Sequence, residues 1–347
     1  MKKIFVRSPY TIAINEVGQI GSKVELFIWN DDVAEPTTPT YTLSKRIVSQ
    51  TQRENVYNIS NKCVEFIKAK NALYTNVIEL ESKKNWAFVK VKRYKETSSN
   101  VFVLLDEETF ICFDGYTSFL GGANQFDDSD NIPLFNTNIK IYKKETTFEY
   151  VNVWLDDLPD ILATEWVLQR PDLTLTTIAS NGSLFKIPYS LDGKYTLYKQ
   201  TNRLIEQFNF VVESICEAKY TPIVCSFINR FGGWSFLTFF KANQKSIEVK
   251  SSTFNLMPQN WQYNTFVGSN KQFNFNGKKN IVCNTGWVDE NYSDLIQDLL
   301  VSETILLDDI PVLCKSTTSE KKTQLKDKNI NYTINFEYNF NLINDVI

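Results

Sequence analysis

The pattern of hydrophobic and polar positions along the chain predicts a protein built mainly from β-strands. The cleanest example is residues 85–95, NWAFVKVKRYK, in which apolar side chains alternate with Lys90, Lys92 and Arg93. Successive side chains of a strand point to opposite faces of a sheet, so this alternation is typical of a strand with one buried and one solvated face. The same alternation recurs in residues 23–29, 246–256 and 330–340.

Residues 216–240, CEAKYTPIVCSFINRFGGWSFLTFF, contain two strand-like runs almost back to back. The runs, residues 222–229 and 233–240, are rich in the β-branched and aromatic residues that suit a pleated surface. Gly232 and Gly233 between them are expected to supply the positive φ of a tight reversal. The segment predicts a β-hairpin buried in a core or against a partner, and the core is the simpler interpretation.

Two further turns are expected from local composition. Asp106-Glu107-Glu108 separates two apolar runs, residues 101–105 and 109–113, and predicts a second hairpin. Asn276-Gly277 is a strong turn dipeptide and predicts the end of a strand there.

Helical patterns are few. Ser60 is a candidate N-cap for a short helix over residues 61–68. Residues 291–302 carry an apolar stripe that predicts an amphipathic helix, formed by Leu295, Ile296, Leu299 and Leu300.

These patterns predict a mainly β fold with two β-sandwich-like or β-barrel-like domains. Residues 1–140 are expected to form an N-terminal domain with the short helix. Residues 141–347 are expected to form a β-rich C-terminal domain with the amphipathic helix near 291–302. The length of 347 residues agrees with two domains at about 150 residues each.

Composition places the chain among soluble globular proteins, with 43% hydrophobic and 22% charged residues. The formal net charge of −3 provides no overall basic field for nucleic-acid phosphates. Basic and aromatic residues do alternate in residues 90–95 and 140–144, and we interpret these as solvated strand faces.

The sequence contains no histidine, which removes the commonest general acid or base and His-assisted nucleophiles. The cysteines are scattered without a CxxC pair and are expected to be free and buried, as in a reducing cytoplasm: Cys63, Cys112, Cys216, Cys225, Cys283 and Cys314. We therefore predict no catalytic, cofactor-binding or metal-binding residues, no cofactor, and no enzymatic activity. Residues 1–14 lack the apolar core of a signal peptide, and no apolar run of about 20 residues predicts a membrane span.

Adjacent acidic residues occur at Asp31-Asp32, Glu107-Glu108, Asp127-Asp128, Asp156-Asp157 and Asp308-Asp309. Neighbours on a strand point to opposite faces, so we interpret these pairs as turns and solvated edges and not as catalytic carboxylates. Residues 127–131, DDSDN, resemble the start of a calcium loop but lack its glycine and distal Glu, and a solvated acidic loop is expected.

Residues 218–241, AKYTPIVCSFINRFGGWSFLTFFK, resemble a signature of virion proteins from tailed phages that infect Bacteroidota, roughly KYTP-x-V-x-F-x-N-(R/K)-(F/Y)-G. The C-terminal runs TGWVDENYSDLIQDLLVSETILL, IPVLCKS and NINYTINFEYNFNLI fit the same pattern. So do the N-terminal runs KVELFIW, PTYTLSKR and NVYNIS. The resemblance is to short-tailed crAss-like phages and their relatives, and its most specific part is residues 219–241.

The resemblance implies a structural tail hub or ring protein below the portal, with no catalytic residues. It implies a homo-oligomeric ring, six-fold or twelve-fold, in contact with portal-proximal ring proteins and distal tail proteins. DNA would pass through this conduit without specific binding. The protein would be made in the host bacterial cytoplasm and located in the virion tail. Two alternatives stay open: a receptor- or glycan-binding tail module, and a carboxylate-dependent glycoside hydrolase.

Overall fold

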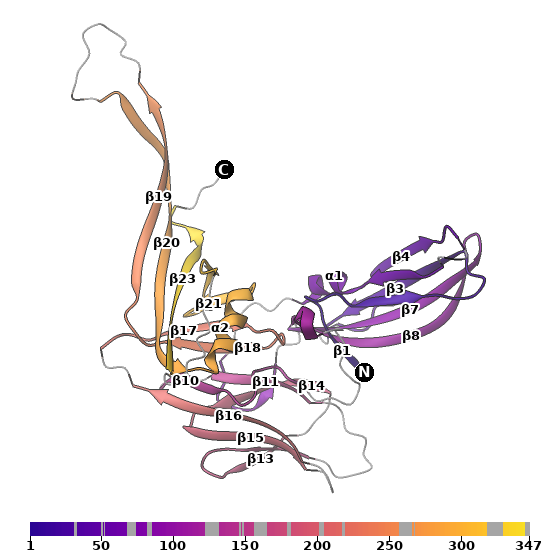
Figure 1. The fold of residues 1–347 in the computed structure, drawn as a ribbon, viewed down its shortest axis with the longest axis horizontal. Helices are drawn as coiled ribbons and strands as arrows, with labels where there is room; N and C mark the ends of the chain where they lie inside the picture. The colour runs from indigo at the N-terminus through magenta and orange to yellow at the C-terminus, as the bar shows by residue number, and fades with distance from the viewer. Residues whose placement is uncertain are drawn as a thin grey trace.

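The computed structural model describes residues 1–30, 33–49, 51, 53–67, 74–81, 85–121, 132–145, 147, 149–155, 165–178, 182–200, 205–216, 219–256, 266, 268–317 and 329–343. The fold is mainly β, as predicted, with several sheets and short helices (Figure 1).

The N-terminal part forms a five-stranded sheet that lies to one side of the molecule (Figure 1). Its spatial order is β1 (Lys2–Phe5), β8 (Val101–Phe113), β7 (Trp86–Ser98), β3 (Gly21–Trp29) and β4 (Tyr41–Arg46). β1 runs parallel to β8, and the other pairs are antiparallel. A two-stranded sheet of β2 (Thr11–Ile14) and β5 (Asn55–Asn58), with helix α1 (Ser60–Cys63) and the 3₁₀ turn η1 (Val64–Phe66), shares its core.

The hairpin expected around Asp106-Glu107-Glu108 is wrong, because β8 runs through these residues without a turn. Arg93 on β7 pairs with Asp106, and Lys92 lies 3.7 Å from Glu107. The acidic run is therefore one side of a cross-strand charge ladder, which a strand accommodates as well as a turn does.

The short N-terminal helix is present, but Ser60 does not cap it. Ile59 occupies the N-cap position, and Ser60 is the first helical residue. The Ser60 hydroxyl instead accepts a hydrogen bond from the backbone N–H of Tyr10 at 2.8 Å, which ties α1 to the chain before β2.

Two sheets occupy the middle of the molecule. One has the order β10 (Lys140–Lys144), β16 (Ile205–Ile215), β15 (Gly193–Gln200), β12 (Glu165–Gln169) and β13 (Leu175–Ile178). The other has the order β6 (Glu79–Leu80), β14 (Ser183–Tyr189), β11 (Glu149–Leu155) and β9 (Ile132–Pro133). A 3₁₀ turn, η2 (Phe119–Gly121), lies on the chain between β8 and β9.

The C-terminal part forms a seven-stranded sheet. Its order is β18 (Trp234–Phe239), β17 (Ile223–Ile228), β21 (Ile305–Leu307), β22 (Ile310–Cys314), β23 (Asn329–Asn341), β20 (Asn270–Asp289) and β19 (Gln244–Asn255). Helix α2 (Tyr292–Val301) buries the predicted apolar stripe in the core that this sheet shares with the middle sheets.

The turn expected at Asn276-Gly277 is wrong, because β20 continues through both residues to Asp289. Gly277 pairs with Val249, and a register shift between Lys250 and Ser252 lies beside it. The Asn-Gly dipeptide therefore lies next to a β-bulge, where a residue without a Cβ is also favoured.

The sheets change where the chain leaves β8 at Phe113 and enters β9 at Ile132. β6 comes from the N-terminal part of the sequence but pairs with β14 in the middle of the molecule. The division into domains at residue 140 stays a prediction.

All six cysteines are free. Cys63, Cys112, Cys225 and Cys283 are buried, as expected, and Cys314 is partly buried. The expectation of burial is wrong for Cys216, which is exposed where the chain leaves β16.

Candidate interaction surface

The predicted hairpin at residues 216–240 is formed by β17 and β18, and its turn is held by Asn229. The Asn229 Oδ1 accepts hydrogen bonds from the backbone N–H groups of Phe231 (2.9 Å) and Gly233 (3.2 Å). The Asn229 Nδ2 donates to the carbonyl of Leu134 (2.8 Å) and to Ser235 Oγ (2.8 Å). Every residue of both strands is buried, so the interpretation as a core hairpin is confirmed.

The two glycines of the turn have different roles, and only one matches the expectation. Gly232 has a positive φ of +83°. Gly233 does not, but a Cβ there would lie 2.4 Å from the carbonyl oxygen of Leu134. Gly233 is therefore needed for close packing and not for a left-handed backbone.

The same turn contacts the segment that leaves the N-terminal sheet. The backbone N–H of Tyr116 donates to the carbonyl of Arg230 at 2.7 Å. A Cβ on Gly115 would lie 2.6 Å from that carbonyl, and one on Gly232 would lie 2.7 Å from the backbone nitrogen of Asp114. The hairpin turn thus joins the N-terminal and C-terminal sheets through backbone contacts.

Buried charge accompanies this junction. Asp298 of α2 accepts a hydrogen bond from Asn136 Nδ2 at 3.2 Å, and Arg230 donates to Asn136 Oδ1 at 2.9 Å. Burial raises the pKa of Asp298 to about 6, and the charge of Arg230 opposes this rise. Burial likewise raises the pKa of Asp114 to about 6, with Arg7 opposing it. Both carboxyl groups therefore titrate close to neutral pH.

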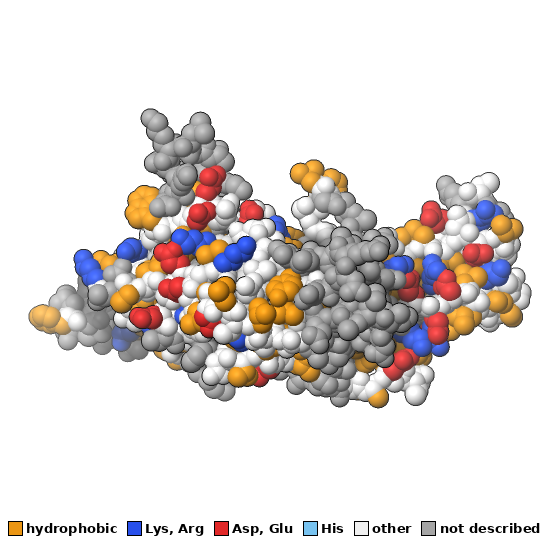
Figure 2. All heavy atoms as spheres, turned by 90° about the horizontal axis from the view of Figure 1, so that it is seen from below, with side chains coloured by type: hydrophobic (Ala, Val, Ile, Leu, Met, Phe, Trp, Pro, Cys, Tyr) orange, Lys and Arg blue, Asp and Glu red, His pale blue; other side chains and the backbone are white. Residues whose placement is uncertain are grey.

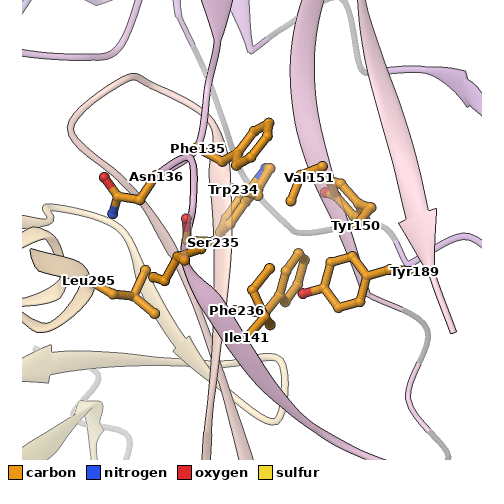
Figure 3. A pocket seen from close by; sticks show the side chains of 11 residues that line it. Phe135, Asn136, Ile141, Tyr150, Val151, Tyr189, Trp234, Ser235, Phe236 and Leu295 are labelled. Atoms are coloured by element: carbon orange, nitrogen blue, oxygen red, sulfur yellow. The ribbon is translucent and has the colours of Figure 1, made fainter. Parts of the chain in front are cut away.

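A small cavity lies between β11, β14, β18 and α2 (Figure 3). Aromatic rings of Tyr150, Tyr189, Trp234 and Phe236 gather around it, and Leu295 approaches from α2 (Figure 3). Its volume of about 20 Å³ has room for about one water molecule and none for a substrate.

Glu149 is completely buried beside this region. Its carboxylate accepts hydrogen bonds from Tyr189 Oη (2.9 Å) and Thr147 Oγ1 (3.0 Å). Burial raises the pKa of Glu149 to about 7, and these hydrogen bonds and the charge of Lys143 oppose the rise. A cavity of about 20 Å³ has no room for a substrate, so we regard Glu149 as a structural group.

The most exposed regular structure is the hairpin of β19 and β20, which projects from the sheet (Figure 1). All 12 residues of β19 are exposed. β23 pairs with β20 only as far as Lys278, so the first part of β20 pairs with β19 alone. We call the residues beyond β23, 250–256 and 268–275, the arm.

The arm carries apolar side chains on its exposed surface. Phe254, Phe273 and Phe275 are 44%, 44% and 47% exposed. The rings of Phe254 and Phe273 lie edge to face, with centroids 5.5 Å apart. The arm therefore presents a pair of half-exposed aromatic rings on a two-stranded ribbon.

A groove of about 530 Å³ lies at the base of the arm. Its lining combines apolar and basic side chains, among them Ile247, Lys279, Ile310, Tyr338 and Phe340. Ile247 is 59% exposed and Phe340 is 47% exposed. The apolar surface of the arm therefore continues onto the sheet that supports it.

The arm and its base are also basic. Residues 241–282 contain six lysines and one glutamate, a formal charge of +5, so the rest of the chain carries −8 of the total of −3. Lys271 and Lys279 are exposed and form no ion pair with any acidic residue that the structure describes. Most of these lysines therefore lie at the base of the arm, and the arm itself carries Lys250, which lies 3.6 Å from Glu248, and Lys271.

The basic residues of the N-terminal sheet are arranged differently. Lys90 lies 3.1 Å from Glu35, and Arg93 pairs with Asp106. Basic and acidic side chains lie beside one another at the right-hand end of the molecule in Figure 2. Lys140 on β10 similarly pairs with Glu213, and Lys143 is buried. The interpretation as a solvated strand face agrees with the pairing for residues 90–95. It is wrong for residues 140–144, because Ile141, Tyr142 and Lys143 are all buried.

Two of the acidic pairs lie in the described residues. Glu107 faces Lys90 and Lys92, whereas Glu108 forms an ion pair with Lys2 at 2.6 Å. Asp308 and Asp309 form the turn between β21 and β22, both with positive φ, as the turn interpretation predicted. The other pairs, Asp31-Asp32, Asp127-Asp128 and Asp156-Asp157, and the DDSDN run lie outside the described residues.

No group of three or more His, Cys, Asp or Glu side chains is placed to hold a metal ion in the described ranges. None of the helices in the part of the chain that the structure describes is long and apolar enough to cross a membrane.

No protein-family model matches the sequence, and no curated protein matches it. The resemblance to phage tail proteins therefore stays a prediction. The arm itself was missed by sequence reasoning, although both of its strands alternate in the printed sequence. The concentration of lysine in residues 241–282 is a signal that could have drawn attention to this hairpin.

Proposed function

We propose that this protein is a non-enzymatic structural subunit of a phage tail, a hub or ring component that assembles with copies of itself below the portal. The ring, six-fold or twelve-fold, would form part of the conduit for genome ejection. The resemblance of residues 218–241 to phage virion proteins supplies the setting.

The observation that carries the proposal is the exposure of β19 along its whole length. An outermost strand offers a row of unpaired N–H and C=O groups, and a long exposed one invites pairing with another chain. β19 carries Ile247 and Val249, both 59% exposed, beside this free edge. A subunit of a permanent assembly covers such an edge, whereas a monomer leaves it as a site of aggregation.

A conduit for DNA has to avoid retaining it, so we expect an acidic or neutral surface along the channel. Under this proposal the basic arm contacts protein and does not line the channel.

Location of the chain in a reconstruction of the virion tests the proposal. We expect density for this chain in a ring around the tail axis, and we expect purified protein to form oligomers of one size. A chain that stays monomeric at high concentration and is missing from purified virions would refute the proposal.

Exposed aromatics favour one alternative, a receptor- or glycan-binding tail module. Trp287 is 68% exposed at the end of β20, and sugars stack on such rings. Binding of the purified protein to host cells or to a glycan array, abolished by Trp287→Ala, would support this alternative. Loss of oligomers in the same variant would instead favour the structural role.

A further inference from the structure

The acidic residues of the C-terminal third are concentrated as strongly as its basic ones. Residues 289–309 contain seven acidic residues and no lysine or arginine. Asp289, Glu290 and Asp294 lie at the start of α2 and are partly exposed. We call this surface the acidic end of α2.

Trp287 lies directly beside the acidic end. A register shift in the pairing of β20 with β23 falls between Asn284 and Trp287, and Gly286 in the shift has a φ of +75°. Bulges re-aim side chains. Here Val288 is buried while Trp287 is turned outward and 68% exposed. An exposed aromatic ring next to carboxylates complements a surface of phenylalanine and lysine.

The arm of the same molecule cannot reach this surface. Lys271 and Asp289 lie near opposite ends of the continuous strand β20. At about 3.3 Å per residue, the strand holds them on the order of 50 Å apart. Figure 1 shows the arm pointing away from α2. The two complementary surfaces can therefore meet only between molecules.

We propose that the arm of one copy docks on the acidic end of α2 and Trp287 of a second copy. The inference rests on the proposed structural function and names the contact between neighbouring subunits. Its warrant is charge complementarity between Lys250 and Lys271 on the arm and Asp289, Glu290 and Asp294 at the acidic end of α2. The two surfaces differ, so the contact is head-to-tail, which is the type of contact that closes into a ring.

Reversal of single charges on the full-length protein tests the contact. In Lys271→Glu the arm repels the acidic end, and in Glu290→Lys the acidic end repels the arm. By light scattering over a concentration series, we expect each variant to need at least fivefold more protein than the wild type for half-assembly. The matched control is Lys194→Glu, an exposed strand lysine on β15 without an ion pair to a described residue, which should assemble like the wild type.

Combining the two charge reversals tests whether the single variants fail to assemble because Lys271 and Glu290 no longer pair or because the variants do not fold. The double variant Lys271→Glu/Glu290→Lys and an equimolar mixture of the two single variants should both assemble within about twofold of the wild type. If the wild type assembles and both single variants match it, the docking inference is wrong and the proposed function stands. If the wild type does not assemble at any concentration and is absent from virions, both are wrong.

Discussion

The two outermost strands of the C-terminal sheet, β18 and β19, have opposite environments. Every residue of β18 is buried, and every residue of β19 is exposed. β18 reads WSFLTF without a charge, whereas β19 reads QKSIEVKSSTFN and places lysines among its apolar residues. The difference shows that this sheet covers one edge within the molecule and leaves the other exposed, and we propose that a neighbouring subunit covers the exposed edge.

The hairpin that contains β18 is held on several sides, which explains its burial. Asn152 accepts a hydrogen bond from the backbone N–H of Trp234 at 2.8 Å, and Tyr150 packs on Phe236 with ring centroids 5.0 Å apart. The arm is held less closely, since Phe254 and Phe273 pack edge to face on each other and are each 44% exposed. We therefore expect the β17–β18 hairpin to contribute most to the stability of the folded subunit, and the arm to contribute to association between subunits.

Trp234→Ala should have the largest effect on folding. Trp234 is 1% exposed, and truncation of a buried Trp costs about 3 to 5 kcal/mol of unfolding free energy because it leaves a cavity. Denaturation in urea measures the loss. Trp287→Ala makes the same substitution at a 68% exposed position and should change stability by less than about 1 kcal/mol. Equal losses of unfolding free energy in Trp234→Ala and Trp287→Ala would contradict the conclusion that β18 is a buried edge of the sheet and that Trp287 lies on its exposed surface.

Gly232→Ala should destabilise the protein by about 3 kcal/mol, because strain from its positive φ adds to a clash with the backbone of Asp114. Gly268 provides the matched control. Its φ of +69° is similar, but a Cβ there meets nothing within 4 Å. Gly268→Ala should therefore cost only about 1 kcal/mol. Similar losses in both would show that the turn does not need its close contact with the N-terminal sheet.

Glu149 should make stability depend on pH. Its pKa rises from the ordinary value to about 7 in the folded protein, so the folded state holds a proton that the unfolded state has released at intermediate pH. Stability should therefore fall as pH rises from about 4.5 to about 7, by on the order of 3 kcal/mol.

Glu149→Gln removes this titration. Urea denaturation at pH 5.5 and pH 8 should show a smaller difference between the two pH values in the variant than in the wild type. Asp298 and Asp114 contribute in the same direction and remain in both proteins. If the pH dependence of stability is the same in the variant and the wild type, it arises from Asp298 and Asp114 and not from Glu149.

Phe273→Ala should have the smallest effect on folding, below about 1 kcal/mol, because the ring is 44% exposed on the arm. Its effect on assembly should be larger than its effect on folding, since under the proposed docking a neighbouring subunit covers the ring. The urea denaturation midpoint measures the effect on folding, and the molecular mass of the protein in solution measures the effect on assembly. A large loss of stability with normal assembly would show that Phe273 stabilises the folded subunit and not the contact between subunits.

Much of the fold could be predicted because its patterns are local. Alternation located β7, β19 and β23, and the apolar stripe located α2. The errors came from residues whose role is set by a partner in space. Asp106-Glu107-Glu108 has turn composition but faces lysine and arginine on β7. Gly233 resembles a turn glycine but is required by the carbonyl of Leu134.

The candidate interaction surface could not be predicted for the same reason. Ser246–Leu256 alternates like any half-buried strand, and nothing local shows that β23 ends before it can support the arm. The length of one strand relative to another is a property of sheet pairing. Segregation of charge along the chain was visible in the sequence, but its meaning depends on the separation that β20 imposes between its two ends.

Amide hydrogen exchange of the two edge strands, in dilute monomer and in the assembled protein, tests the central claim most directly. Residues of β18 should be protected in both states. The backbone N–H groups of β19 that do not pair with β20 should exchange rapidly in the monomer and become protected in the assembly. Rapid exchange of β19 in both states would show that the exposed edge is not the surface through which this protein assembles.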